Sequence, residues 1–264
     1  MRASHAYLLI ALLCVVGAVL ALPAVFPAAL APERAIAQVA PEQLQLKPGQ
    51  PRPQLPADGA YLAGDTLRFS LDRYRDYERL RFSGNDEIYY LTIEPAAMGG
   101  RVLKYDSGDV ALQVAGWGGV TIYTHDAPGG VPAERLGDVA RAPEPIISPD
   151  AKTFAARSSD EISMRTSLTI GFKANWQGLD QSDVMRALAT DAIRNATRAI
   201  ERIASSHKTG QTLLAQFGVV RITPAPEPGV VVADKLLTVS ISEVHGLAGR
   251  PSSLAIAKVI GAKL

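Results

Sequence analysis

The sequence predicts an α+β protein: a small antiparallel β-meander or barrel-like module, followed by a strand–helix–strand–strand–helix module. Three observations carry this prediction. Short runs of β-favouring residues, separated by glycine-rich turns, fill residues 61–125. Apolar residues then recur at helical spacing after Asp180. Proline-rich segments at 38–60 and 126–160 set these modules apart from the N-terminus and from each other.

Residues 1–37 have the layout of a secretory signal peptide. A short start with one positive residue, Arg2, precedes an almost uncharged run over residues 6–31, and Ala35-Ile36-Ala37 supplies an A-x-A cleavage site. Because the run at 6–31 is also long enough to cross a bilayer, an uncleaved anchor is the alternative. The sequence therefore predicts a periplasmic or secreted protein, or one held in the inner membrane by residues 6–31.

Cysteine content and charge exclude several classes of protein. The single cysteine, Cys14, lies inside the apolar run, so the mature chain would have no disulfide, no thiolate metal ligand and no cysteine nucleophile. The whole chain carries a formal net charge of +1, and removal of residues 1–37, with Arg2, Glu33 and Arg34, leaves it neutral. A neutral exported chain has no overall attraction for nucleic acid, so no such partner is expected.

Five prolines in residues 38–60 predict an extended linker, because proline fixes φ and removes hydrogen-bond donors. The β-rich module follows at 61–125. Its expected strands are short, several alternate apolar with polar residues, and turns rich in Gly, Asn and Asp separate them. These strands are expected at 67–71, 80–82, 88–93, 102–105, 110–114 and 120–123.

Residues 126–160 contain further prolines and predict a connector, with one helical turn at 133–141. The second module is predicted over residues 161–264. Its long helix begins after Asp180 or Ser182 as N-cap and ends near Lys208 and Gly210. Around this helix we expect strands at 162–170, 217–222 and 230–241, and a last helix from Arg250 to Lys258.

The catalytic motifs that the sequence offers are weak. Ser205 to Lys208 fits S-x-x-K and Lys208 to Gly210 fits K-T-G, but serine β-lactamases use two separate lysines for these boxes. Here both share Lys208 at the end of a helix, where the negative end of the dipole would not activate a serine. The histidines outside the leader, His125, His207 and His245, stand far apart in sequence, so no metal site and no cofactor is predicted.

Two groups of residues are candidates for binding an anion. Arg194, Arg198 and Arg202 follow at i, i+4 spacing on the long helix, although Asp191 and Glu201 are placed to neutralise them as a solvated face. The second group is Arg250 with Ser252, where an arginine stands beside the free N–H groups of a helix start. A plain serine cap explains this second group equally well.

Trp117 is the third candidate contact residue. It stands in A-G-W-G-G-V between two predicted strands, where glycines supply the φ values that a tight turn requires. The tryptophan itself is not needed for chain reversal. If it is exposed beside Tyr123 or His125, it is the first choice for a contact residue; if it is buried, the segment is only a corner of the sheet.

Three segments resemble a family of secreted bacterial proteins of unknown function. They are V-L-K-Y-D-S-G-D-V-A-L-Q-V at 102–114, G-G-V-T-I-Y-T at 118–124 and G-R-P-S-S-L-A-I-A-K-V-I at 249–260. With the exported start and the proline connector, the resemblance covers most of the mature chain. Its motifs are structural, so it implies no activity and no catalytic residue.

The sequence thus favours a non-catalytic exported module that binds an anionic component of the cell envelope or another envelope protein. From the sequence alone, contact with a membrane is expected only through the N-terminal segment, if that segment is uncleaved. The alternative is an envelope hydrolase whose site assembles from distant residues. In that case two or more acids or histidines should meet in a cleft, from among Asp72, Asp86, Glu87, His125 and His245.

Overall fold

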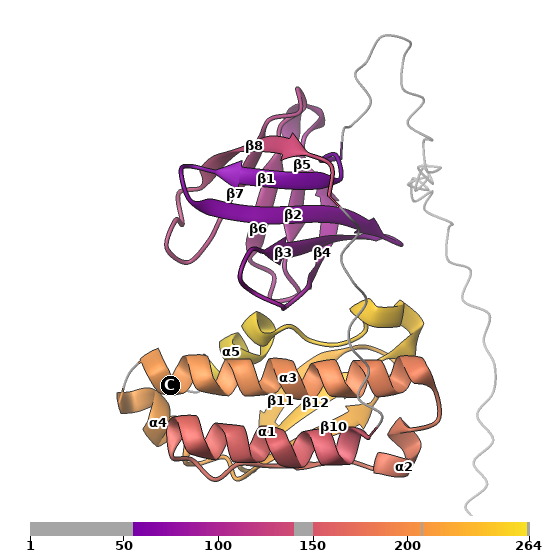
Figure 1. The fold of residues 1–264 in the computed structure, drawn as a ribbon, viewed down its shortest axis with the longest axis vertical. Helices are drawn as coiled ribbons and strands as arrows, with labels where there is room; N and C mark the ends of the chain where they lie inside the picture. The colour runs from indigo at the N-terminus through magenta and orange to yellow at the C-terminus, as the bar shows by residue number, and fades with distance from the viewer. Residues whose placement is uncertain (1–54, 140–149, 207, 263–264) are drawn as a thin grey trace, which may run out of the picture. The chain divides into compact units, whose positions relative to one another are not determined.

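The computed structural model describes residues 55–139, 150–206 and 208–262 (Figure 1). They form a closed eight-stranded barrel followed by helices packed on a four-stranded sheet, which confirms the α+β class and the barrel-like first module. The predicted signal peptide or anchor at 1–37 lies outside the described residues, as does most of the predicted linker. Among the described helices, none combines the length and apolar composition that crossing a bilayer requires.

The barrel is an up-and-down meander in which every strand pairs antiparallel with its neighbour in sequence. The last strand closes on the first. All six predicted runs are strands. The strands are β1 (Gly59–Ala63), β2 (Leu67–Tyr74), β3 (Tyr77–Phe82), β4 (Tyr89–Pro95), β5 (Arg101–Lys104), β6 (Val110–Val114), β7 (Val120–Ile122) and β8 (Val131–Gly137). A 3₁₀ turn, η1 (Ala97–Gly99), joins β4 to β5.

The helical turn predicted at 133–141 is wrong, because strand β8 occupies residues 131–137. The sequence of β8 is polar and contains Pro132, and neither feature favours a strand when the segment is considered alone. Pairing of β8 with both β1 and β7 satisfies the backbone groups that two open sheet edges would otherwise expose. The barrel therefore extends into the segment that composition alone marks as a connector.

The inward-facing positions of the barrel hold one apolar core. Aliphatic side chains at the same parity along the strands are fully buried, and the Tyr61 and Phe69 rings stack with centroids 5.2 Å apart. The aliphatic members with 0 % exposure are Leu71, Leu80, Leu91, Leu103, Leu112 and Ile122. Side chains thus fill the interior of the barrel. The alternation of apolar and polar residues along the strands is the pattern that predicted them.

One inward position is a carboxylate. Glu78 lies two residues before Leu80 on β3, is 1 % exposed, and has Oε2 3.4 Å from the Arg73 guanidinium. Its other oxygen has no hydrogen-bond partner among the described residues. Burial, assisted by the negative charge of Asp58 and opposed by Arg73, raises the pKa of Glu78 from 4.5 to about 7.

The raised pKa of Glu78 makes the free energy of unfolding depend on pH. Between pH 4.5 and 7 the folded chain holds a proton that the unfolded chain releases, so this group favours folding below pH 4.5 and loses that effect as pH rises to 7. We expect Glu78→Gln to flatten this slope and to stabilise the protein at pH 8 by roughly 1–3 kcal/mol. Urea unfolding at pH 5 and 8 measures both. Glu134→Gln, at an exposed position of β8, is the control, and an equal change in both variants would contradict the assignment.

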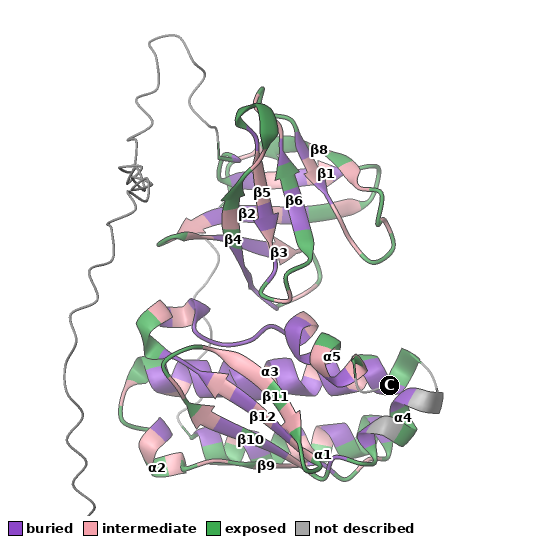
Figure 2. Cartoon of the chain, turned by 180° about the vertical axis from the view of Figure 1, so that it is seen from behind, coloured by how far each residue is buried: buried purple, intermediate pink, exposed green. Residues whose placement is uncertain are grey.

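The second part places helices against a sheet of order β11–β12–β10–β9, in which β10 is parallel to β9 and β12, and β11 is antiparallel. Its central element is the long helix α3 (Asp183–Ser206), of which fifteen of 24 residues are buried (Figure 2). Its N-cap is Ser182, whose Oγ accepts from Met185 N at 3.0 Å. The other elements are α1 (Ala151–Thr166), β9 (Gly171–Lys173), α2 (Trp176–Leu179), α4 (Lys208–Leu214), β10 (Val219–Pro224), β11 (Gly229–Ala233), β12 (Leu236–Ile241), the 3₁₀ segment η2 (Glu243–Ala248) and α5 (Ser253–Gly261).

Two predicted strands in this part are wrong. Residues 162–166, expected to begin a strand, are the last turn of helix α1, which Asp150 caps by accepting from Lys152 N and Thr153 N. Buried residues recur along α1 at helical spacing, and this longer period outweighs the alternation that starts at Ile162. The single strand expected at 230–241 is the hairpin β11–β12, which turns at Asp234 and Lys235 with φ of 49° and 62°.

The helix ends are closer to expectation. The long helix ends at Ser206, and Lys208 begins the short helix α4 rather than closing α3. The predicted last helix is α5, with Ser252 as its N-cap. The domain boundaries drawn from composition stay predictions, with β8 and the start of α1 both lying between residues 126 and 160.

Candidate functional site

The three arginines predicted to form a stripe on α3 have different surroundings. Arg194 lies over the Phe154 ring of α1, 5.3 Å from its centroid, and 3.8 Å from Asp191. Arg198, one turn later, pairs with Asp86 of the β3–β4 loop and donates to Asn195 Oδ1 at 3.0 Å. Arg202 is exposed at the next turn. Only Arg198 and Arg202 line a common pocket, so the stripe divides after Arg194.

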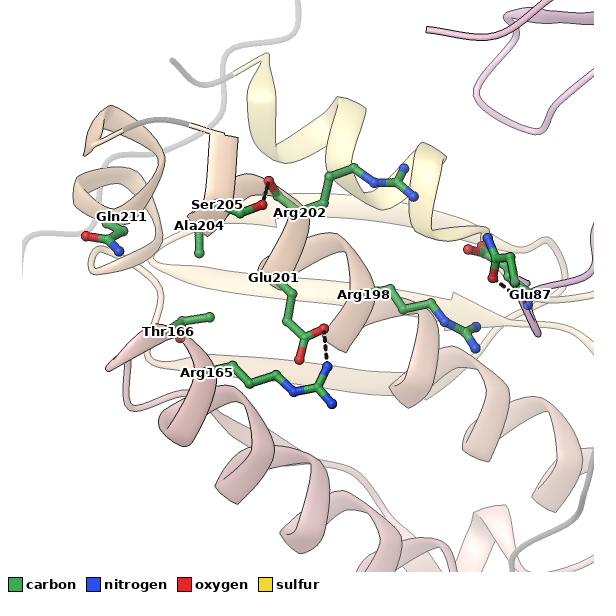
Figure 3. A pocket seen from close by; sticks show the side chains of 10 residues that line it. Glu87, Arg165, Thr166, Arg198, Glu201, Arg202, Ala204, Ser205 and Gln211 are labelled. Carbon is green, nitrogen blue, oxygen red and sulfur yellow. Dashed lines mark hydrogen bonds and ion pairs between the residues drawn. The ribbon is translucent and has the colours of Figure 1, made fainter. Parts of the chain in front are cut away.

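This pocket has a volume of about 550 Å³ and is formed by the end of α1, the last turns of α3, helix α4 and the β3–β4 loop. Figure 3 shows Arg165 of α1 reaching Glu201 of α3, while Arg198 and Arg202 extend toward the side where Glu87 lies. Five charged side chains therefore line it, three guanidinium groups and two carboxylates. We call it the arginine pocket.

Most charges in the arginine pocket already have partners. Arg165 pairs with Glu201 at 3.1 Å and with Glu161 at 2.7 Å. Arg202 forms no ion pair with any residue that the structure describes; its neighbour is the Tyr89 hydroxyl. Burial and the nearby Glu87 carboxylate raise the pKa of Tyr89 to about 12, so this phenol stays neutral and does not act as a counter-ion for Arg202.

Arg250, a second predicted site residue, is 3 % exposed and lies between the barrel and α3. Its Nε donates to Asp191 Oδ2 at 2.5 Å and its Nη2 to the Ile88 carbonyl oxygen at 2.7 Å. The guanidinium lies 4.9 Å from the centroid of the Tyr90 ring. Every polar contact named here is to the chain itself, which is the arrangement that a buried arginine requires.

The N-terminus of α5 binds two carboxylates of the barrel. Asp106 accepts from Ser252 N at 2.6 Å and from Ser252 Oγ at 2.5 Å. Glu87 accepts from Ser253 N at 2.8 Å and Ser253 Oγ at 2.7 Å, and from the Tyr89 hydroxyl at 2.9 Å. Carboxylates are favoured at this end of a helix, where N–H groups are free and the dipole is positive.

Both interpretations of the Arg250–Ser252 segment are therefore visible in the geometry. Ser252 Oγ accepts from Ala255 N at 3.2 Å, as a helix cap does. The same segment also holds anions, but these are the carboxylates of Asp191 and Asp106, which belong to the chain. That Arg250 and Ser252 bind a separate ligand stays a prediction, and their donors are engaged inside the protein.

Trp117 is 82 % exposed, at the tip of the β6–β7 turn. Gly118 takes a φ of 96° and donates its N–H to the Ala115 carbonyl oxygen at 2.8 Å, so the glycine serves chain reversal as expected. The indole contributes to none of the three hydrophobic clusters of the described residues. The tryptophan is thus exposed rather than buried, and its role as a contact residue stays a prediction.

Four of the five acids and histidines that a hydrolase could use have partners within the chain, and the fifth, His125, is exposed. Asp72 forms a buried ion pair with Arg79 on the neighbouring strand, and His245 lies 2.9 Å from both Tyr77 Oη and Glu227. Asp86 pairs with Arg198, and Glu87 binds α5. Among the described residues there is no group of three or more His, Cys, Asp or Glu side chains able to hold a metal ion.

Sequence reasoning missed Arg165 and Glu201 as pocket residues, and Asp106 and Glu87 as partners of α5. Each reaches its partner from a distant part of the chain; Glu87 and Ser253 are separated by 166 positions. Spacing along one helix could reveal only Arg198 and Arg202. The residues from Asp106 to Asp109 predict a hairpin turn, and the structure has a turn there. Nothing in their spacing indicates that Asp106 also accepts hydrogen bonds from Ser252.

A search among curated proteins and a search among solved structures gave no match. A family model, described as a domain of unknown function, matches residues 41–260, which is most of the chain. The match spans the barrel, the helices α1 and α3, and the segment around Arg250. The resemblance to a family of unknown function is thereby confirmed: the chain belongs to the family DUF4908.

Proposed function

We propose that this protein is an exported, envelope-associated binding module that recognises an anionic group, without catalysing a reaction on it. The observation that carries the proposal is the arginine pocket, where the guanidinium groups of Arg165, Arg198 and Arg202 line one cavity. The ligand class is a phosphoryl or carboxylate group on an envelope component, such as a phosphorylated glycan or a lipid headgroup.

The chemistry of the pocket favours such a group. A volume of about 550 Å³ accommodates a small ligand or the end of a larger one. Guanidinium groups bind phosphate and carboxylate oxygens through paired, charge-assisted hydrogen bonds. Arg202 is the arginine that we expect to bind the ligand most directly, because Arg165 and Arg198 already form salt bridges and Arg202 forms none with the described residues.

Two further features support the proposal. The partners of Asp72, Glu87 and His245 fix these groups in ion pairs and hydrogen bonds, which supports a binding role over hydrolysis. The sequence of residues 1–37 supports export, and export would bring the pocket to anionic envelope components.

Calorimetric titration with glycerol 3-phosphate, inorganic phosphate and uncharged glycerol tests the proposal. We expect both anions to bind and glycerol not to bind, with affinity falling at higher salt. Arg202→Gln should weaken binding of glycerol 3-phosphate about tenfold, since a hydrogen bond to a charged group contributes roughly 1.5–3 kcal/mol. Arg221→Gln, at an exposed position of β10 outside the pocket, is the matched control and should bind like the parent.

Equal affinity of Arg202→Gln and Arg221→Gln would remove the pocket as the site. Binding of glycerol as tight as that of glycerol 3-phosphate would remove the anionic group as the determinant. Release of phosphate from glycerol 3-phosphate above the rate in buffer would favour the hydrolase instead. Fractionation of cells tests the export step separately, because recovery in the cytoplasm would overturn it whatever the pocket binds.

A further inference from the structure

We propose that the end of the barrel that carries Met98 and Trp117 inserts into the interfacial region of a lipid bilayer. Met98 in η1 is 90 % exposed and Trp117 in the β6–β7 turn is 82 % exposed, the two highest values among the large exposed apolar side chains of the described residues. Tryptophan is favoured at the boundary between lipid headgroups and acyl chains, where its ring is apolar and its N–H is hydrated.

The two side chains are presented by turns in direct contact. A Cβ at Gly116 would lie only 2.2 Å from the Met98 carbonyl oxygen, so the β6–β7 turn packs its backbone against η1. A Cβ at Gly119 would lie 3.0 Å from the indole Nε1, which leaves Gly119 as the residue beside the Trp117 ring. The close approach at Gly116 places Met98 and Trp117 on adjoining turns, and we call these two exposed side chains the apolar tip.

Met98 has an unfavourable backbone conformation as well as an exposed side chain. Its φ of 55° and ψ of 32° lie in the left-handed region, which costs a residue with a Cβ free energy that glycine would not lose. Because the side chain of Met98 is 90 % exposed, its burial inside the protein does not offset this cost. Strained residues of this kind concentrate where a side chain acts outside its own fold.

The topology of the barrel identifies the occupant as a bilayer. In a meander where all neighbours are antiparallel, the β4–β5 and β6–β7 turns lie at the same end as the start of β1. The chain that precedes β1 therefore enters from the same end of the barrel as the apolar tip. Its residues 6–31 form the uncharged run that is long enough to cross a membrane.

Chain length and charge agree with this orientation. Only 27 residues separate Ala31 from Gly59, and in the extended form that prolines favour a chain of that length spans roughly 85 Å, so an anchored apolar run would tether the barrel within that distance of the bilayer. Arg101 begins β5 beside η1 and donates from Nη1 to the Gly100 carbonyl oxygen at 3.2 Å. It adds a positive charge at this end, which favours anionic headgroups.

The tryptophans of the chain allow a direct test, because there are only two. Trp176→Phe leaves Trp117 as the single tryptophan, and Trp117→Phe leaves Trp176, which is half-buried in α2. The full chain, as the cell produces it, is combined with vesicles of phosphatidylcholine and phosphatidylglycerol whose acyl chains carry bromine, a quencher of indole. We expect a blue shift and a roughly twofold loss of Trp117 fluorescence. Trp176 in the same vesicles should be unaffected.

The outcomes separate the possible partners. Equal quenching of both tryptophans, or of neither, would overturn the proposal, whether residues 1–37 are cleaved or retained. A blue shift of Trp117 that grows with protein concentration and needs no lipid would assign the tip to a second copy of the chain instead. Met98→Ser tests the shared surface and should reduce the quenching of Trp117. Circular dichroism checks its fold, which an exposed side chain should not disturb.

Discussion

Replacement of Arg250 with alanine is expected to lower the free energy of unfolding by about 3–5 kcal/mol. The substitution removes both hydrogen bonds of the guanidinium, to Asp191 Oδ2 and to the Ile88 carbonyl oxygen. It leaves Asp191, which is only 8 % exposed, as a buried charge without its closest partner. It also removes the cation from the Tyr90 ring. Guanidinium unfolding followed by circular dichroism measures the change.

Arg194→Ala is the matched control for this measurement. Arg194 is on the same network, 3.8 Å from Asp191, but its side chain is 26 % exposed and its main contact is the Phe154 ring. We expect a loss of about 1 kcal/mol or less. In the double variant Asp191→Leu with Arg250→Met both buried charges are absent, so it should be more stable than Arg250→Ala alone. A similar loss in Arg194→Ala and Arg250→Ala would show that burial of the charge is not the cause.

The elements that sequence reasoning identified share one property, which is that their signal is local. The strands β2 to β7 are only three to eight residues long, and several of them alternate apolar and polar side chains. Their turns carry glycine where φ must be positive, as at Gly108 and Gly118. Helix α3 repeats its apolar face over six turns. Periodicity and turn chemistry of this kind are physical properties of short segments, so they survive without knowledge of the rest of the fold.

The elements that were missed are decided by distant segments. Strand β8 has an exposed, polar sequence and becomes a strand because β1 and β7 would otherwise keep unpaired backbone groups. At Ile162 two periods overlap, and the choice of helix depends on how α1 packs against α3, which no window of the sequence contains. Tertiary contacts override local preference at both places.

The candidate site shows the same division. The i, i+4 spacing of Arg198 and Arg202 places them on one helix face, and that much could be predicted. The pocket also needs Arg165 from α1 and Glu87 from the barrel, and their approach depends on the assembled fold. At α5 the sequence correctly indicated a place for anions beside Ser252. It could not indicate that Asp106 and Glu87 would supply them, because both come from turns about 150 positions earlier.

Glu87 provides the second large effect. We expect Glu87→Ala to lower the free energy of unfolding by about 3–4 kcal/mol, because three donors lose a buried acceptor at once and each unsatisfied group costs roughly 1–3 kcal/mol. These donors are Ser253 N, Ser253 Oγ and the Tyr89 hydroxyl, and both Ser253 and Tyr89 are almost fully buried. Chemical unfolding measures the loss, as it does for Arg250.

Asp106→Ala is the control that separates a buried acceptor from an exposed one at the same helix end. Asp106 also receives a backbone N–H and a hydroxyl, from Ser252, yet its carboxylate is exposed, so water replaces it and the loss should stay near 1 kcal/mol. Amide hydrogen exchange locates the effect: in Glu87→Ala the N–H of Ser253 and the first turn of α5 should exchange faster, while the ladder between β5 and β6 keeps its protection. If the barrel amides lost protection together with α5, Glu87 would stabilise the barrel itself. Faster exchange in α5 alone would show that Glu87 mainly holds this helix against the barrel.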